Sequence, residues 1–187
     1  MDFRTQIKEY QPWNEEEAQD KKVFIKYIEQ FPDILTRRNE FAHMTSSSWI
    51  LNREHTKVLM VYHNIYNSWS WTGGHADGEE DLLHVAIKEA KEETGIKTIR
   101  PLTKDIFSLE LLCVQGHWKR GKYVSPHIHL NTTFLLEAEE AEEVRNKPDE
   151  NRAVKWVLAE EAAAISREPW MQIIYKKLNK KLEEIAW

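Results

Sequence analysis

A chain of 187 residues is long enough to bury a hydrophobic core and to form one domain with an appendage. Hydrophobic residues make up 41% of it and charged residues 30%, which is typical of a soluble globular protein. The net charge of -5 argues against a general affinity for nucleic acid polymers, and no stretch approaches the length of a membrane span.

The single cysteine, Cys113, permits no internal disulfide bond, which favours a reducing compartment. The N-terminal sequence carries no apolar run of the kind that a signal peptide needs. We therefore expect a cytoplasmic protein. Because Cys113 lies within an apolar run, we also expect it to be a core residue rather than a nucleophile.

Residues 1–40 predict a helical extension that precedes the main domain. Asn14 is suited to cap a helix whose first turn is acidic, and Glu17 stands where a capping box requires a carboxylate. Apolar residues continue at helical spacing until Pro32 follows the expected end. We expect this helix to pack against the domain that follows. Covering a substrate and mediating a homodimer are the alternatives.

The main domain is expected to span residues 41–187 and to begin with two strands. In residues 41–52, polar side chains alternate with residues that suit a core, and residues 57–62 form a contiguous apolar run. Trp69 and Trp71 then lead to the paired glycines 73–74. We expect these glycines to turn the backbone sharply before a helix.

The stretch from Gly74 to Ile96 has the periodicity of a helix in its second half. Small and apolar residues recur every three or four positions, which predicts one narrow packing stripe: Leu83, Ala86, Ile87, Ala90 and Thr94. Gly95 stands where a helix commonly ends.

Three glutamates, Glu89, Glu92 and Glu93, share another face of this helix, because their spacing is i, i+3 and i+4. Like charges so placed repel one another and destabilise the helix unless a partner compensates them. A solvated acidic face is the simpler interpretation. A hard divalent cation with oxygen ligands is the alternative that the spacing favours.

Two further strands are expected at residues 106–114 and 127–136, joined through a loop with a basic tip at residues 115–123. His127 and His129 lie on one side of the second strand, because side chains alternate along a strand. Such a pair can bind a transition metal such as zinc. We favour instead a role in lining the substrate pocket or in structural hydrogen bonds.

The last part of the chain predicts an acidic loop, a strand and a helix. Residues 137–150 are acidic and rich in turn formers, and residues 152–158 resemble a strand. A terminal helix begins near Pro169. Its expected apolar face consists of Trp170, Ile174, Leu178, Leu182 and Ile185.

The spacing from Gly74 to Ile96 closely resembles the signature of the Nudix hydrolases, G-x5-E-x7-R-E-U-x-E-E-x-G-U, where U is apolar. The chain departs from it in one clear place, because Lys88 stands where the family has arginine. The subgroup stays open. The resemblance implies an α/β fold, the Nudix α/β/α sandwich with a mixed sheet between helices, and here an N-terminal helical extension.

The resemblance also implies a function, which is Mg²⁺- or Mn²⁺-dependent hydrolysis of a nucleoside diphosphate linked to another group. Glu92, Glu93 and the Gly74 carbonyl match metal ligands. Glu89 matches a residue that binds metal or accepts a proton from water. Lys88 matches the arginine that orients this glutamate, but a lysine lacks the planar fork.

Other residues are implied with less detail. In the family, the approach to the glycines carries substrate-side residues, so Trp69 or Trp71 is a candidate for stacking on a base, and core packing is an equal alternative for each. A loop carboxylate outside the signature often completes the metal site. The candidates are Glu142, Glu143, Asp149 and Glu150.

Two rival functions remain open. An isopentenyl diphosphate isomerase shares the fold but needs a catalytic cysteine beside the loop before the helix, and Cys113 lies far along the chain. A sensor that binds a nucleotide ligand without cleaving it is the second rival, and the intact glutamates favour catalysis over it. The expected partner is a small nucleotide-type substrate, without nucleic acid polymer or membrane.

Overall fold

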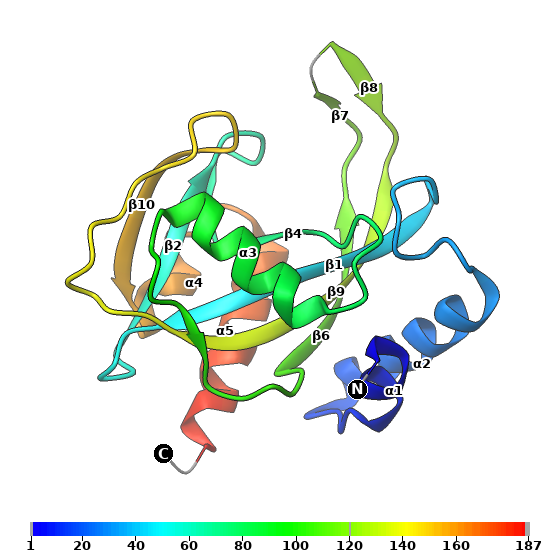
Figure 1. Cartoon of the computed structure of the whole chain (residues 1–187), viewed down its shortest axis with the longest axis horizontal. Coiled ribbons are helices and arrows are strands. Elements are labelled where there is room, and N and C mark those ends of the chain that lie inside the picture. Colours follow the sequence, from blue (N-terminus) through cyan, green and yellow to red (C-terminus); the bar gives the residue numbers. More distant parts are fainter. Residues whose placement is uncertain (1, 120, 186–187) are drawn as a thin grey trace.

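A curled mixed β-sheet forms the centre of the computed structural model, which describes residues 2–119 and 121–185 (Figure 1). Its path is β10-β2-β1-β9-β5, with β3 paired to β2, β4 to β1 and β6 to β9. The strands are β1 Ala42–Leu51, β2 Lys57–His63, β3 Ser68–Ser70, β4 Thr72–His75, β5 Arg100–Pro101, β6 Ser108–Val114, β9 His127–Glu137 and β10 Asn151–Leu158. The long central pair β1 and β9 is parallel.

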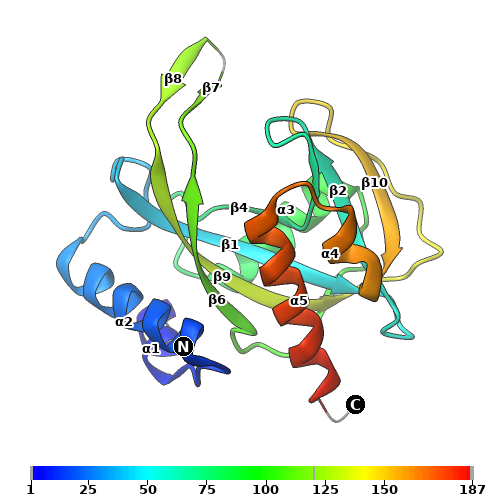
Figure 2. The same cartoon turned by 180° about the vertical axis from the view of Figure 1, so that it is seen from behind.

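Helices cover both faces of this sheet (Figures 1 and 2). The helices are α1 Phe3–Glu9, α2 Glu15–Gln30, α3 Leu82–Thr94, α4 Ala162–Ile165 and α5 Pro169–Glu183, with a 3₁₀ turn η1 Ala159–Glu161 before α4. One core cluster joins α3 to the sheet and a second joins α5 to it. The α/β/α sandwich with an N-terminal helical extension is therefore confirmed.

The loop expected at residues 115–123 contains a two-stranded ribbon, β7 His117–Lys119 and β8 Lys122–Val124 (Figure 1). The ribbon projects away from the sheet. Arg120, which belongs to the expected basic tip, lies outside the described residues.

Helix α3 ends as predicted, but its start differs from the prediction. Gly95 adopts φ 75°, the left-handed conformation that glycine tolerates best, and closes the helix. The paired glycines 73–74 do not turn the chain, because both lie in strand β4. The turn comes at Asp77 and Gly78, with φ 47° and 95°. The buried stripe is also shifted: it includes Leu82 and Val85, and Leu83 and Ile87 are only partly buried.

The terminal helix α5 also departs in two positions from its predicted apolar face. Ile185 lies beyond the end of the helix and is only partly buried. Ile174, Leu178 and Leu182 are buried as expected. Trp170 is 53% exposed, because it lies in the first turn of the helix, where the chain borders a cleft. None of the helices within residues 2–119 and 121–185 has the length and apolar character that a bilayer crossing requires.

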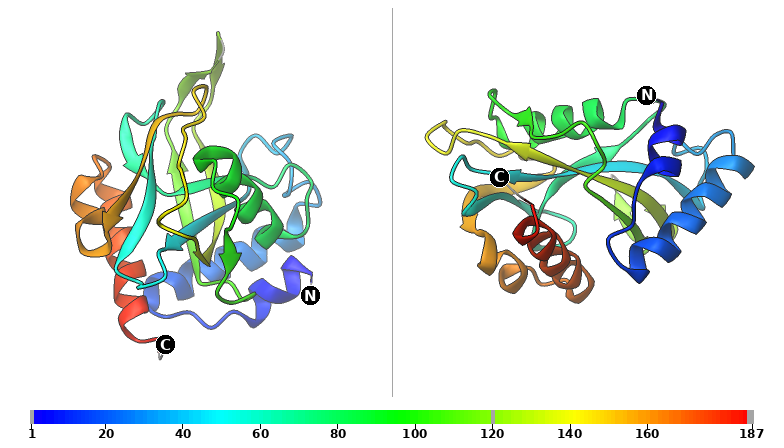
Figure 3. Two further views of the ribbon diagram at one scale, coloured as in Figure 1. Left: turned by 60° about the vertical axis from the view of Figure 1, so that its left-hand side comes forward. Right: turned by 90° about the horizontal axis from the view of Figure 1, so that it is seen from below.

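The N-terminal helices pack against the domain, as expected, and the right-hand view of Figure 3 shows them beside the sheet. Asn14 caps α2 by accepting a hydrogen bond from Glu17 N at 2.9 Å. Glu17 does not return the bond in a capping box. Its side chain is fully buried, and its Oε1 lies 3.1 Å from Lys177 Nζ and 2.9 Å from Lys181 Nζ. The two lysines on α5 therefore anchor the extension.

Glu17→Gln is expected to destabilise the protein by about 3–5 kcal/mol at neutral pH. The substitution removes the negative partner of a buried ion pair and leaves a buried positive charge uncompensated. Burial raises the pKa of Glu17, but Lys177 and Lys181 outweigh it and bring the pKa to about 2. This pKa lies below the ordinary 4.5, so the ion pairs stabilise the fold above pH 4.5 and lose that effect as pH falls from 4.5 towards 2.

The measurement is urea unfolding between pH 2 and pH 7 for the wild type, Glu17→Gln and the exposed control Glu16→Gln. We expect the control to stay within about 0.5 kcal/mol of the wild type. The wild type should lose stability over the acidic window more steeply than Glu17→Gln does. Parallel pH profiles for these two proteins would contradict the assignment.

Candidate active site

A cleft of about 730 Å³ opens beside residues 73–75 of β4 and the C-terminal half of α3. Strands β1, β4 and β9, helix α3 and the loop before β10 all contribute to its lining. Its carboxylates are Glu40, Asp77, Glu89, Glu92, Glu93, Asp149, Glu150 and Glu168, and its histidines are His43, His63, His75, His117, His127 and His129. Two chemically different sets of side chains thus share one cleft.

The three glutamates of α3 line this cleft and differ in how far each is buried. Glu93 is buried and its Oε1 accepts a hydrogen bond from Gly73 N at 2.8 Å, which ties the helix to β4. Glu89 is half-buried and Glu92 is exposed. The helical spacing therefore does bring the three carboxyl groups to one place.

Two of these three carboxyl groups, Glu89 and Glu93, have raised pKa values. Burial of Glu92 is instead outweighed by Lys147 and Lys88, which lower its pKa. Burial raises the pKa of Glu93 well above its ordinary value, and the nearby charges of Glu150 and Glu89 add to the effect. Burial also raises the pKa of Glu89, against the opposing influence of Lys88. Since a cation between these groups would lower both pKa values, the cluster is suited to bind one.

Glycine at positions 73 and 74 allows β4 to approach its neighbours closely. A Cβ atom on Gly74 would lie 2.5 Å from Glu89 Cδ, and one on Gly73 would lie 2.4 Å from Ser47 Oγ. These glycines are thus required for close packing rather than for a turn. The backbone of Gly74 borders the carboxyl group of Glu89 directly.

Two lysines contact the carboxylates. Lys88 Nζ lies 3.3 Å from Glu89 Oε1 and 3.6 Å from Glu92 Oε1. Lys147 Nζ, from the loop before β10, lies 3.1 Å from both Glu92 Oε2 and Glu150 Oε2. Burial opposes the charge of Lys147, but these carboxylates outweigh it and raise its pKa. Lys147 was not predictable from the sequence, because no local pattern connects this loop to the helix.

The structure divides the four candidate loop carboxylates. Asp149 and Glu150 line the cleft. Glu142 instead accepts hydrogen bonds from the backbone of Lys97, at 2.7 Å, and of Thr98. Glu143 is exposed and is not part of the cleft lining. Of these four carboxylates, Asp149 and Glu150 are the two that lie in the cleft lining.

The two tryptophans that are candidates for stacking on a base, Trp69 and Trp71, lie in different surroundings. Trp71 lines the cleft while most of its surface is buried against Tyr175, with ring centroids 5.6 Å apart. Trp69 does not line the cleft and packs edge-on against Tyr62 at 5.3 Å. Of the two, only Trp71 is positioned for a ligand in this cleft.

Cys113 is exposed and lines the cleft, so the expectation of a core position is wrong. It lies on β6 opposite Ile128 of β9, near the end where β6 leaves the sheet towards the β7–β8 ribbon. An apolar run on a strand therefore does not guarantee that each of its side chains is buried.

The predicted pair His127 and His129 does lie on one side of β9, with 3.1 Å between the two Nε2 atoms. His43 from β1 and His75 from β4 join them, and the four rings contact one another. Burial, together with the neighbouring histidines, lowers the pKa of His129 to about 2. Burial likewise lowers the pKa of His43. The rings of His43 and His129 are therefore uncharged at neutral pH.

The model of the NUDIX domain family matches residues 42–178, which is most of the chain. The chain belongs to the Nudix family. Membership of this family supports a pyrophosphohydrolase, an enzyme that acts on acid anhydrides. The helices α1 and α2 lie outside the matched region. No curated protein matches this sequence.

Solved structures with the Nudix fold are similar to this chain throughout their length. A C. elegans Ap4A hydrolase in a binary complex has a TM-score of 0.56 and 21% identity, over 76% of this chain and 98% of that one. RenU, a Nudix hydrolase of M. smegmatis, has a TM-score of 0.56 and 15% identity, over 79% of this chain and 90% of that one. The MutT protein of Methanosarcina mazei Go1 has a TM-score of 0.54 and 16% identity, over 78% of this chain and 99% of that one. These similarities show the fold.

The Nudix helix α3 offers the ligand chemistry of a hard divalent cation. The carboxyl groups that line the cleft supply oxygen ligands, which Mg²⁺ and Mn²⁺ prefer. The pKa values of Glu89 and Glu93 are raised by burial, and a nearby positive charge would oppose that effect. Gly74 has no side chain that would cover them. The residues present are therefore compatible with the metal that the family implies.

Proposed function

We propose that this Nudix protein hydrolyses a diphosphate bond in a nucleoside diphosphate linked to another group, with Mg²⁺ or Mn²⁺ as cofactor. The observation that carries the proposal is the arrangement of Glu89, Glu92 and Glu93 in the cleft, with Glu93 tied to the Gly73 N–H at 2.8 Å. A small nucleotide-type substrate suits a cleft of about 730 Å³ that holds both polar groups and Trp71.

In this proposal, Glu92, Glu93 and the backbone carbonyl of Gly74 would hold the cation. When bound, the cation supplies charge neutralisation at the phosphoryl oxygens and a lower pKa for the attacking water. Asp149 or Glu150 would add a further oxygen ligand from the loop.

Glu89 either joins the ligands or accepts the proton of the attacking water. Its half-buried carboxyl group lies beside the backbone of Gly74, and its Oε1 is 3.3 Å from Lys88 Nζ. Lys147 is held between Glu92 and Glu150 and keeps a positive charge beside the site of the reaction. Trp71 offers part of an aromatic face for a base, for which stacking contributes about 1–3 kcal/mol.

Hydrolysis is expected to require the cation. Chelator should abolish the release of products from a panel of nucleoside triphosphates, dinucleoside polyphosphates and nucleoside diphosphate derivatives, and added Mg²⁺ or Mn²⁺ should restore it. The products are identified by chromatography at slightly alkaline pH. Full activity in excess chelator would overturn the proposal, and tight ligand binding without turnover in excess Mg²⁺ would favour a sensor.

The exposed Cys113 in the cleft is the one observation that favours the isomerase alternative. The same assay therefore includes isopentenyl diphosphate and the variant Cys113→Ser. The proposed hydrolase should leave isopentenyl diphosphate unchanged and keep its hydrolytic rate in the variant. Isomerisation that depends on Cys113 would replace the proposal.

Lys88→Ala is expected to lower kcat up to about five-fold, because an exposed ion pair contributes at most about 1 kcal/mol. Lys88 is 53% exposed, and its Nζ lies 3.3 Å from Glu89 Oε1. Lys88→Arg should preserve or raise kcat, since arginine restores the planar fork of the family signature. An unchanged kcat in the alanine variant would show that Lys88 is only a surface charge.

A further inference from the structure

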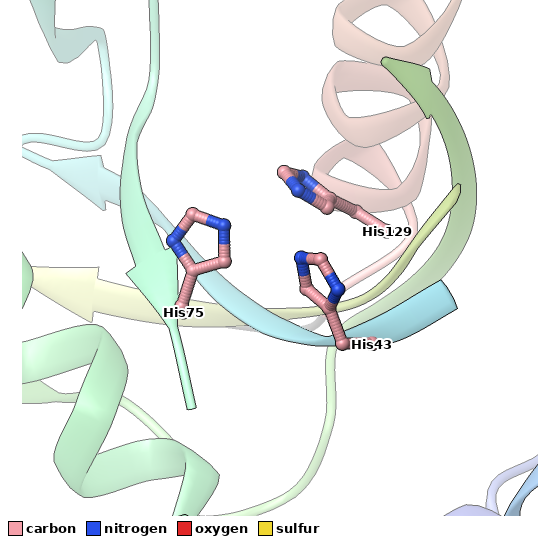
Figure 4. Close-up of side chains that lie close together, drawn as sticks. All are labelled: His43, His75 and His129. Atoms are coloured by element: carbon pink, nitrogen blue, oxygen red, sulfur yellow. The ribbon is translucent and has the colours of Figure 1, made fainter. Parts of the chain in front are cut away.

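A cluster of histidines lies in the cleft and is separate from the glutamates in its chemistry. His43 of β1, His75 of β4 and His129 of β9 point their rings towards one another (Figure 4). Each offers a ring nitrogen that lies within 4.8 Å of the other two. Strand pairing fixes the arrangement: His43 lies opposite His129, and Thr45 opposite His75. Three hydrogen-bonded strands thus supply one side chain each to a common point.

The hydrogen bonds of His43 leave one lone pair aimed into the interior. Its Nδ1 lies 2.9 Å from the carbonyl oxygen of Asn39, which can only accept, so Nδ1 carries the proton. Its Nε2 is buried and has no hydrogen-bond partner among residues 2–119 and 121–185. A histidine that donates to a backbone carbonyl through one nitrogen and presents the other bare is the usual form of a metal ligand.

The proton positions of the pair on β9 follow by the same reasoning. His127 Nδ1 lies 2.8 Å from the carbonyl oxygen of Ser125 and therefore donates to it. For two neutral rings, His129 Nε2 must then donate to His127 Nε2 across the 3.1 Å that separates them. His129 Nδ1 keeps its lone pair. His127 accordingly orients His129, as a carbonyl orients His43.

We propose that His43, His75 and His129 bind one transition-metal ion, with Zn²⁺ as the expected occupant, in the same cleft as the glutamates but through separate ligands. Imidazole nitrogens suit Zn²⁺ and its neighbours, whereas Mg²⁺ and Mn²⁺ prefer oxygen. His127 is a positioning residue for this site.

The geometry requires little change on binding. Zinc–nitrogen bonds of about 2.0–2.1 Å at a tetrahedral angle place two nitrogens about 3.4 Å apart. Two ring nitrogens as far apart as 4.8 Å, the upper limit for this cluster, would therefore have to approach each other by about 1.4 Å. Rotation of the imidazole rings can supply this movement while the strands stay in place. Three protein ligands leave a fourth position, as in zinc sites that bind an exchangeable ligand. Since all three histidines line the cleft, that position is accessible to a bound molecule.

The test is metal binding and does not depend on hydrolysis. Zn²⁺ is titrated calorimetrically, and Co²⁺ by its visible absorption, into the full chain in excess Mg²⁺, which occupies the carboxylate site and competes poorly for imidazole. We expect about one equivalent of either ion to bind. His43→Gln, His75→Gln and His129→Gln should each weaken binding by at least about 100-fold, and His127→Gln by about 10- to 100-fold.

His84→Gln is the matched control, because His84 is exposed on α3 and does not line the cleft. It should bind Zn²⁺ like the wild type. Melting temperatures without metal show whether each variant is folded. A wild-type protein that binds no Zn²⁺ or Co²⁺ in excess Mg²⁺ would overturn the proposal without reference to any variant. Equal losses in His84→Gln and in folded cluster variants would overturn it as well.

Discussion

Glu89→Gln is expected to lower kcat by about 10²–10⁴-fold, the usual contribution of a general base, if Glu89 accepts the proton of the attacking water. The substitution preserves the size of the side chain but removes its charge and its basic oxygen. Apparent affinity for Mg²⁺ should stay nearly intact, so added metal should not restore the rate. Glu92→Gln and Glu93→Gln should instead weaken metal binding, and high Mg²⁺ or Mn²⁺ should recover part of their activity.

The measurement is kcat against metal concentration for the three variants, with melting temperatures of the metal-free proteins. Loss of folding is not expected, because a neutral side chain relieves repulsion within the cluster. If high metal rescues Glu89→Gln as well as it rescues Glu92→Gln, then Glu89 is a ligand. The base would then be sought at Glu150, which lines the same cleft. Full activity of Glu89→Gln at ordinary metal concentration would remove it from the mechanism.

Gly74→Ala is expected to lower kcat by about 10²-fold while the protein stays folded. The added Cβ would lie 2.5 Å from Glu89 Cδ, which is the end of a flexible side chain. That side chain can move aside at small cost in stability. Its carboxyl group then leaves the position that the reaction needs, and a displacement of about 1 Å can cost 10²-fold in rate.

Gly73→Ala is the matched comparison in the adjacent position. Its Cβ would lie 2.8 Å from both Ser46 O and Ser47 Cα, which are backbone atoms of β1 and cannot move aside. We therefore expect Gly73→Ala to lower the melting temperature more than Gly74→Ala does. The two variants are compared by thermal unfolding and by kcat at saturating Mg²⁺. Wild-type kcat in a folded Gly74→Ala protein would refute the close contact with Glu89.

The sequence by itself determined the elements whose information is local. The helix of Glu89, Glu92 and Glu93, its end at Gly95 and the cap at Asn14 all follow from helical spacing and terminal residues, and the structure has them. His127 and His129 share a side because strands alternate, which is also a local rule. The Nudix signature is contained within one such stretch, so the family and the carboxylate cluster were predictable.

Only the tertiary structure decided what meets across distant segments. Lys147 forms ion pairs with both Glu92 and Glu150 because the loop before β10 lies against α3. Residue spacing in the sequence does not predict this contact. Cys113 is exposed because its position on β6, opposite Ile128 of β9, borders the cleft.

The parallel pairing of β1 with β9 places His43 opposite His129, and this register places both histidines in one cluster with His75. Contacts of this kind depend on strand order and register, which local propensities do not specify.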